Sequence, residues 1–162
     1  MIQPTIDNLL CRAEGDVIGT QYCFDYTEGV QILLGLLRRN IRVRLLLDKS
    51  QVVSPSSSRQ KERVKALLEW DAEVRGVHPD NNAKYGIMHA KTWLIDGEIY
   101  IGGSSNFTNN SLTNSIEQCI VLRQDHVTAT HIEWFEGLWA RATDYAQILA
   151  EDAAEETKLR VL

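Results

Sequence analysis

The order of strand-like and helix-like segments along the 162-residue chain predicts an α/β fold, a mixed β-sheet flanked by helices on both faces. In the first half, apolar spacings typical of strands alternate with spacings typical of helices. A strand pair joined by Asp96-Gly97 follows and adds antiparallel strands to the sheet. Since no linker interrupts the pattern, we expect a single domain over residues 1–162, with its core at about 6–143 and an acidic C-terminal helix or tail at 144–162.

The first half of the chain supplies the alternation. Residues 27–40 predict a helix, because Val30, Leu33 and Leu37 recur at helical spacing and Thr27 suits the N-cap position. Residues 41–48 (IRVRLLLD) begin as an alternation and end as an apolar run, which is typical of a strand. The other segments expected here are strands at 16–24 and 73–77 and a helix at 59–70.

The second half begins with a loop at 78–86 that is rich in turn-forming residues. Strands at 87–95 and 98–102 then face each other across Asp96-Gly97, a dipeptide favoured in type I′ turns. A strand at 117–123 and a helix at 128–143 complete the expected order. We expect Trp134 to pack in the core or in a dimer interface, and His126 and His131 to lie on the surface.

Charge is distributed unevenly along the chain. The 17 basic and 22 acidic residues give a net charge of −5, which argues against a nucleic-acid partner. Residues 38–65, however, hold nine bases and only two acids, while residues 144–162 hold five acids and two bases. Solvated helix faces are the favoured interpretation of the basic stretch, and a surface that guides nucleic acid is the alternative.

The cysteines and the hydropathy pattern bear on the compartment. Cys11, Cys23 and Cys119 are odd in number, widely spaced and without a CxxC pair, so we expect reduced thiols and neither a disulfide framework nor a zinc site. No run approaches the roughly 18 apolar residues that a membrane span needs. The sequence therefore predicts a soluble chain without a transmembrane segment or secretion signal, in the cytoplasm or another reducing intracellular compartment.

The most informative stretch surrounds the hairpin. His89 and Lys91 are two residues apart, so on a strand they point to the same face. The returning strand ends near Gly103, and Ser104 and Asn106 follow at once. Because a hairpin brings its ends together, an imidazole, an ammonium, a hydroxyl and an amide are expected to converge. This set of groups suits the negative charge of a phosphoryl transition state.

The spacing of these residues resembles the HKD signature, HxK(x)4D(x)6GSxN, of the phospholipase D superfamily. The order of strands and helices around it is similar to that of the single-motif members, such as the Nuc-type endonucleases and the mitochondrial cardiolipin hydrolases. The resemblance thus covers most of residues 16–143 and implies the phospholipase D-like sandwich. The residues that match the signature are His89, Lys91, Asp96, Gly103, Ser104 and Asn106.

The resemblance implies a two-step mechanism in which His89 attacks phosphorus and forms a phosphohistidine. Since the chain carries one motif, the second histidine must come from another copy, which implies a homodimer that shares one active site. Glu117 stands where the family places an acidic residue bonded to the motif histidine, and Asp96 is expected to organise the hairpin more than to touch substrate. Lys91 and Asn106 would supply the charge stabilisation, so no metal or cofactor is expected.

Three functions remain open at this point. The first is a metal-independent phosphodiesterase that hydrolyses nucleic acid in the manner of an endonuclease. The second is a hydrolase of phospholipids such as cardiolipin, which would need an apolar approach surface. The third is a catalytically silent binding module that retains the fold, and the intact motif argues against it.

Overall fold

The computed structural model describes residues 2–54, 58–78 and 86–160. Within them the strands form one seven-stranded sheet in the order β6-β5-β4-β1-β2-β3-β7. Strands β1, β2 and β3 are parallel, and the remaining pairings are antiparallel, which confirms the mixed sheet. The strands are β1 Asp16–Gln21, β2 Arg42–Asp48, β3 Glu73–Val77, β4 Thr92–Ile95, β5 Ile99–Gly103, β6 Cys119–Leu122 and β7 Thr143–Asp144.

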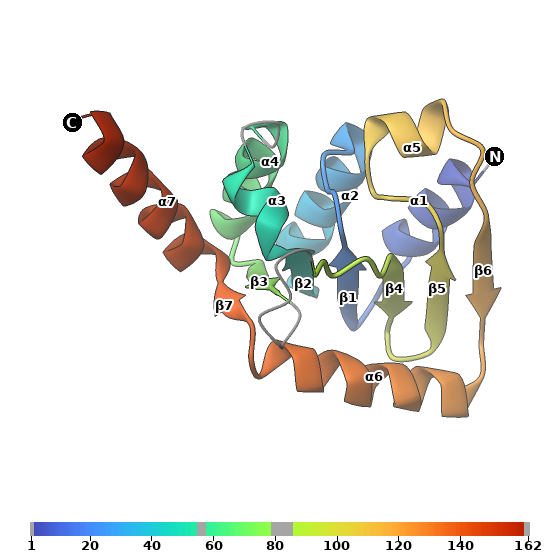
Figure 1. The fold of residues 1–162 in the computed structure, drawn as a ribbon. Helices are drawn as coiled ribbons and strands as arrows, with labels where there is room; N and C mark the ends of the chain where they lie inside the picture. The colour runs from blue at the N-terminus through green and yellow to red at the C-terminus, as the bar shows by residue number, and fades with distance from the viewer. Residues whose placement is uncertain (1, 55–57, 79–85, 161–162) are drawn as a thin grey trace.

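Helices cover both faces of this sheet, as expected (Figure 1). Helix α6 lies along one side, α1, α2 and α4 lie on the other, and α7 extends away from the body. Among the described residues, no helix combines the length and the apolar composition that crossing a bilayer requires. The helices are α1 Gln3–Cys11, α2 Thr27–Arg38, α3 Lys49–Val53, α4 Ser58–Leu68, α5 Asn109–Thr113, α6 Asp125–Trp139 and α7 Tyr145–Arg160.

Two apolar clusters hold these layers together, one on each face of the sheet. The larger lies under α1, α2 and α4, where the helically spaced Val30 and Leu33 pack against strand residues such as Leu45. The smaller lies under α6, where Phe135 and Trp139 are buried. The apolar run in β2 contributes residues to both clusters, because successive side chains of a strand point to opposite faces.

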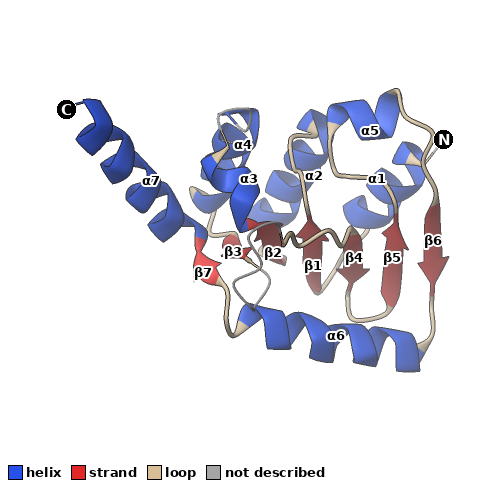
Figure 2. Ribbon diagram, in the orientation of Figure 1, coloured by secondary structure: helices blue, strands red, loops and turns tan. Residues whose placement is uncertain are grey.

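Several elements differ from the sequence expectation (Figure 2). The strand expected at 87–95 is regular only in β4, and residues 86–91 form an irregular segment that leads into it. Tyr26, not Thr27, is the N-cap of α2, and the Thr27 hydroxyl accepts a hydrogen bond from Arg63 instead. Helices α3 and α5 were not expected, because each is a short five-residue element. The turn-rich loop at 78–86 falls largely outside the described residues.

The Asp96-Gly97 hairpin has the expected type I′ character. Both central residues have a positive φ, 55° at Asp96 and 69° at Gly97. The Asp96 carboxylate accepts hydrogen bonds from the backbone N–H groups of Glu14, Gly15 and Asp16 at 2.7–3.2 Å. Asp96 therefore ties the hairpin to the start of β1, at the far end of β4 from Lys91.

Replacing Asp96 by alanine is expected to lower the free energy of unfolding by about 2–3 kcal/mol, because three backbone donors lose a charged acceptor. Asp96→Asn should cost less, since asparagine keeps one acceptor oxygen and tolerates a positive φ. Urea denaturation would measure both effects. The exposed neighbour Glu98, changed to alanine, serves as the control and should stay within about 0.5 kcal/mol of the parent. An unchanged stability in Asp96→Ala would contradict the tethering role.

The basic stretch at 38–65 does not form one patch. Arg42 opens β2, whereas Arg59 on α4 lies near Asp25, beyond the end of β1, so the bases are spread over both ends of the sheet. Four of the nine bases form ion pairs among the described residues, which supports the interpretation as ordinary surface charge. The ion pairs are Arg42–Glu73 and Arg44–Glu136, both 2.6 Å, Arg59–Asp25, 3.4 Å, and Lys61–Asp152, 2.6 Å.

The expectation that His131 lies on the surface is wrong. Its side chain sits between α6 and the sheet with 8% of its surface exposed, and its Nε2 lies 3.2 Å from the Thr92 hydroxyl. Thr92 in turn bonds to the Thr20 hydroxyl at 2.7 Å. Burial lowers the pKa of His131 to about 4, so the imidazole is neutral at physiological pH. His131 lies on the side of α6 that faces the sheet. The spacing between His126 and His131 does not reveal this orientation.

This burial predicts a loss of stability in mild acid. Below pH 6.5 the unfolded chain protonates His131 while the folded chain does not, so stability falls as pH falls from about 6.5 toward 4. Between pH 7 and pH 5 the loss from this residue is expected to be about 2 kcal/mol. Urea denaturation at the two pH values would measure it. His131→Gln, which can still bond to Thr92, should remove this component, and an identical pH response in both proteins would contradict the assignment.

Candidate active site

The residues of the motif other than Asp96 gather at one edge of the sheet, where β1 and β2 end, β4 begins and β5 ends (Figure 1). In open α/β sheets this edge is the usual place for a ligand site. The buried Asp48, the last residue of β2, accepts a hydrogen bond of 2.5 Å from the backbone N–H of Met88. It also caps α3 through the Ser50 N–H. Asp48 therefore holds the irregular segment that carries His89.

Tyr22 packs next to both His89 and Lys91, the two main candidate residues. Its ring meets the His89 imidazole edge-on, with 5.0 Å between centroids. The Lys91 ammonium lies 5.6 Å from the centroid of the same ring. His89 is exposed and Lys91 is buried, so the two residues share a location but differ in access to solvent.

Lys91 is a buried cation without a carboxylate partner. Only 7% of the residue is exposed, and its Nζ donates to the backbone oxygen of His89 at 2.6 Å. Across the described ranges, no ion pair to an acidic side chain is formed by this ammonium. Burial lowers the pKa of Lys91, and the nearby Cys23 and Glu117 oppose that shift only in part. A bound anion would supply the missing negative charge.

The turn after β5 places Ser104 and Glu117 together. The Ser104 hydroxyl donates to the Glu117 carboxylate and accepts a bond from the Gln118 N–H at 3.1 Å. Gly103 allows this approach, because a Cβ at that position would lie 2.1 Å from the Gln118 carbonyl oxygen. The absence of a side chain at Gly103 is therefore needed for the closure of β5 onto the segment before β6.

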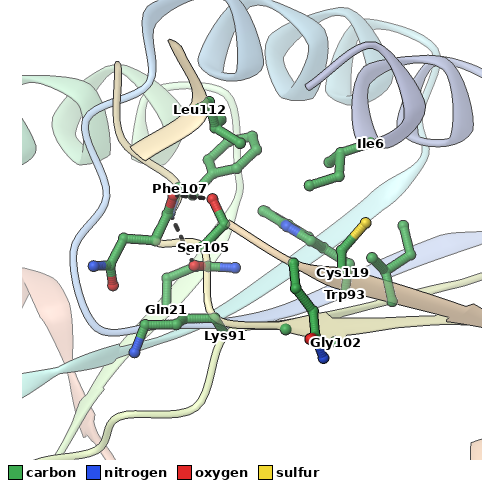
Figure 3. Close-up of a pocket in the computed structure, with 13 residues that line it drawn as sticks. Ile6, Gln21, Lys91, Trp93, Gly102, Ser105, Phe107, Leu112 and Cys119 are labelled. Carbon is green, nitrogen blue, oxygen red and sulfur yellow. Dashed lines mark hydrogen bonds between the residues drawn. The ribbon is translucent and has the colours of Figure 1, made fainter. Parts of the chain in front are cut away.

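Asn106 lies in the loop that follows. The loop is fixed to the end of β1, because the Phe107 N–H donates to Gln21 at 3.1 Å (Figure 3). Gln21, Lys91 and Asn106 line a small enclosed cavity just inside the site. The Asn106 side-chain oxygen is buried without a hydrogen-bond partner in the described structure. The side-chain oxygen of Asn106 therefore lies at the site and can still accept a hydrogen bond.

The expected residues divide into three groups. His89, Lys91 and Asn106 come together at the sheet edge, and Ser104 and Glu117 form a pair beside them. Asp96 lies at the opposite end of β4, as its expected structural role requires. The expectation that Glu117 bonds to His89 is not met in this structure, because its carboxylate turns to the adjacent Ser104 hydroxyl and no hydrogen bond between the described residues joins it to the imidazole.

Three positioning residues were missed from the sequence: Gln21, Tyr22 and Asp48. Asp48 carried a usable signal, since a carboxylate directly after an apolar strand commonly lies at the ligand edge of an α/β sheet. Gln21 and Tyr22 carried none, because both lie in the segment 16–24 that the sequence predicts as one strand, although β1 ends at Gln21. Their role depends on which segments fold against that strand.

The arrangement is suited to binding an anion next to a nucleophile. An exposed imidazole stands beside a buried ammonium and an amide, and the groups are held by backbone contacts that do not involve their own functional atoms, apart from the Lys91 bond to a carbonyl. Fixed donors of this kind stabilise developing negative charge without reorganisation.

Comparisons with known proteins find similar sequences. Residues 6–139 match the sequence-family profile described as "Cardiolipin synthase, PLD-like domain". The mitochondrial cardiolipin hydrolase of Xenopus laevis is 24% identical over 143 residues, and the match covers 84% of this chain and 63% of that protein. The 5'-3' exonuclease PLD3 of Xenopus laevis is 30% identical over 115 residues, covering 67% of this chain and 22% of that protein. The chain thus spans less than two thirds of these relatives.

Solved structures share the fold. Nuc from Salmonella typhimurium, a phospholipase D family member, superposes with a TM-score of 0.77 at 17% identity, covering 88% of this chain and 90% of that chain. NucT from Helicobacter pylori gives a TM-score of 0.74 at 18% identity, covering 88% and 89%. At these identities the similarity establishes the architecture alone.

Proposed function

The chain belongs to the phospholipase D-like family whose profile matches residues 6–139, and on this premise we propose that it cleaves phosphodiester bonds with His89 as nucleophile. The observation that carries the proposal is the buried Lys91 ammonium, which has no carboxylate partner in the described residues and lies beside the exposed His89. Such a cation is costly to bury unless an anion completes the site, and the nucleophile adjoins the place where that anion would bind.

The proposed reaction has two steps and needs no metal ion. A ring nitrogen of His89 attacks phosphorus, the bond to the leaving oxygen breaks, and a phosphohistidine forms. A second imidazole protonates the leaving oxygen and then takes a proton from the water that cleaves the phosphohistidine. Lys91 and Asn106 stabilise the equatorial oxygens. Glu117, through Ser104, holds the turn that leads to Asn106.

The second imidazole belongs to His89 of another copy, so the active form is a homodimer that shares one site. His131 does not serve this purpose, because it is buried under α6 and bonds to Thr92. His89, by contrast, is exposed, so an equivalent residue on a two-fold axis can approach it.

Nucleic acid is the proposed substrate class, and a phospholipid of the cardiolipin type is the alternative. Relatives with either kind of name occur, a 5'-3' exonuclease and mitochondrial cardiolipin hydrolases. The basic stretch gives nucleic acid little support, since its charges are dispersed over both ends of the sheet and four of the nine are paired. The exposed Trp134, which lines a hollow together with His89, favours nucleic acid. The free state of all three cysteines accords with a reducing compartment.

The reaction can be tested with purified protein in the presence of EDTA. Hydrolysis of bis-p-nitrophenyl phosphate, single-stranded and double-stranded nucleic acid, and cardiolipin vesicles would be compared. Activity on a phosphodiester in EDTA, together with an acid-labile phosphoenzyme trapped from labelled substrate, is the expected result. A strict requirement for added Mg²⁺, or a phosphoenzyme that survives in His89→Ala, would overturn the mechanism.

The shared site has a separate test. Light scattering should give a dimer, and mixing parent protein with excess His89→Ala should form hybrid dimers that retain one nucleophile and lack the second imidazole. Hybrids are expected to lose nearly all turnover, because leaving-group protonation is lost. Full activity in a monomer, or hybrids with half the parental activity, would overturn the shared site.

A further inference from the structure

An exposed tryptophan stands beside the candidate active site. Trp134, on α6, is 40% exposed, so of the two expected places the core is excluded and a dimer interface stays a prediction. Its indole lines a hollow of about 250 Å³ together with Ile87, Leu138 and His89 itself. A group bound there would be next to the reacting phosphorus.

Trp134 also lines a second hollow. This hollow has a volume of about 460 Å³ and includes Tyr100, Val127 and Thr130. The His131 ring packs against Trp134 at 5.2 Å between centroids, with 32° between the ring planes. Since His131 is itself bonded to Thr92, its ring holds the indole in place, and both hollows include Trp134 (Figure 2 shows α6 along this face of the sheet).

The chemistry of the first hollow suits one flat ring. It is smaller than the roughly 300–1,000 Å³ of pockets that enclose drug-sized ligands, so it fits a single ring system. An exposed indole at a hollow of this size matches one base next to the scissile phosphate, whereas a fatty acyl chain would need a longer channel.

We propose that Trp134 is a stacking platform for a base that flanks the scissile phosphate, and that the chain therefore acts on single-stranded nucleic acid. The inference rests on the proposed function and names its substrate class. A duplex does not satisfy it, because paired bases are stacked on one another and turned away from the protein. Base–aromatic stacking needs no base-specific hydrogen bond, so little sequence preference is expected.

Binding would be measured separately from catalysis, in the His89→Ala background, by fluorescence anisotropy of a labelled 12-nucleotide single strand. Trp134→Ala should weaken binding by roughly 5- to 150-fold, the range of one base–aromatic stack. Trp134→Phe should restore most of the affinity. An abasic strand of the same length should bind weakly to the parent and respond to Trp134→Ala by less than about twofold. Trp70→Ala, which removes another exposed indole that stacks on Arg38, is the matched control and should change nothing.

The possible outcomes distinguish a failure of the stacking site from a failure of the proposed phosphodiesterase function. Hydrolysis of bis-p-nitrophenyl phosphate in EDTA with equal binding of intact and abasic strands would overturn the stacking site and leave the phosphodiesterase standing. Dissociation of the dimer by Trp134→Ala, with unchanged affinity per site, would assign the indole to the interface and overturn the proposal. A loss of cardiolipin hydrolysis with unaltered strand binding would overturn it in favour of lipid. No activity on any diester would overturn the proposed function itself.

Discussion

Substituting His89 by alanine is expected to lower kcat for phosphodiester hydrolysis by on the order of 10⁴-fold or more. The reason is that the imidazole forms the covalent intermediate, and in a symmetric dimer the same substitution removes the group that protonates the leaving oxygen. Steady-state kinetics on bis-p-nitrophenyl phosphate in EDTA would measure it. Substrate affinity should change little, because Lys91 and Asn106 remain.

The stability of His89→Ala distinguishes a chemical role from a structural one. The His89 side chain is exposed and makes no hydrogen bond within the described residues, so thermal unfolding should stay close to that of the parent. His89→Asn is a second variant that keeps a polar side chain and should be equally inactive. A residual activity above one tenth in either variant would assign the nucleophile elsewhere.

Lys91→Met is expected to lower kcat/KM by roughly 10²- to 10³-fold while leaving the fold as stable as before or more stable. The activity falls because a fixed positive charge near the equatorial oxygens is lost. The stability holds because the folded chain buries this ammonium at a cost, as its lowered pKa indicates, and methionine fills a similar volume without charge. The expected gain in the free energy of unfolding is between 0 and about 2 kcal/mol.

A lower activity together with an equal or higher stability would distinguish a catalytic role of Lys91 from a structural one. A lysine with a purely structural role would lose stability on replacement and leave the chemistry intact. Lys65, on the basic helix α4, is exposed and away from the site, so Lys65→Met controls for the loss of one positive charge. Equal effects of the two substitutions on kcat/KM would show that bulk charge, and not the placement of Lys91, matters.

Much of the fold was readable from local patterns. The spacing in α2, the apolar run of β2 and the Asp96-Gly97 turn each predicted their element, because each depends on neighbours in the sequence. The five-residue helices α3 and α5 were not predicted, since such short helices are held by caps and packing. The early part of the strand expected at 87–95 was also wrong, because Asp48 bonds to Met88 where a neighbouring strand would have bonded.

The site, like the fold, was predictable from the sequence only in part. The sequence by itself determined the residue types and their spacing, His89, Lys91, Ser104 and Asn106, because a hairpin returns the chain to its start whatever surrounds it. Only the tertiary structure decided that Lys91 is buried without a carboxylate and that Glu117 faces Ser104. It also decided that the ring of Trp134 lies beside His89. These facts depend on contacts between segments far apart in the chain, and local spacing carries no information about which distant side chains meet.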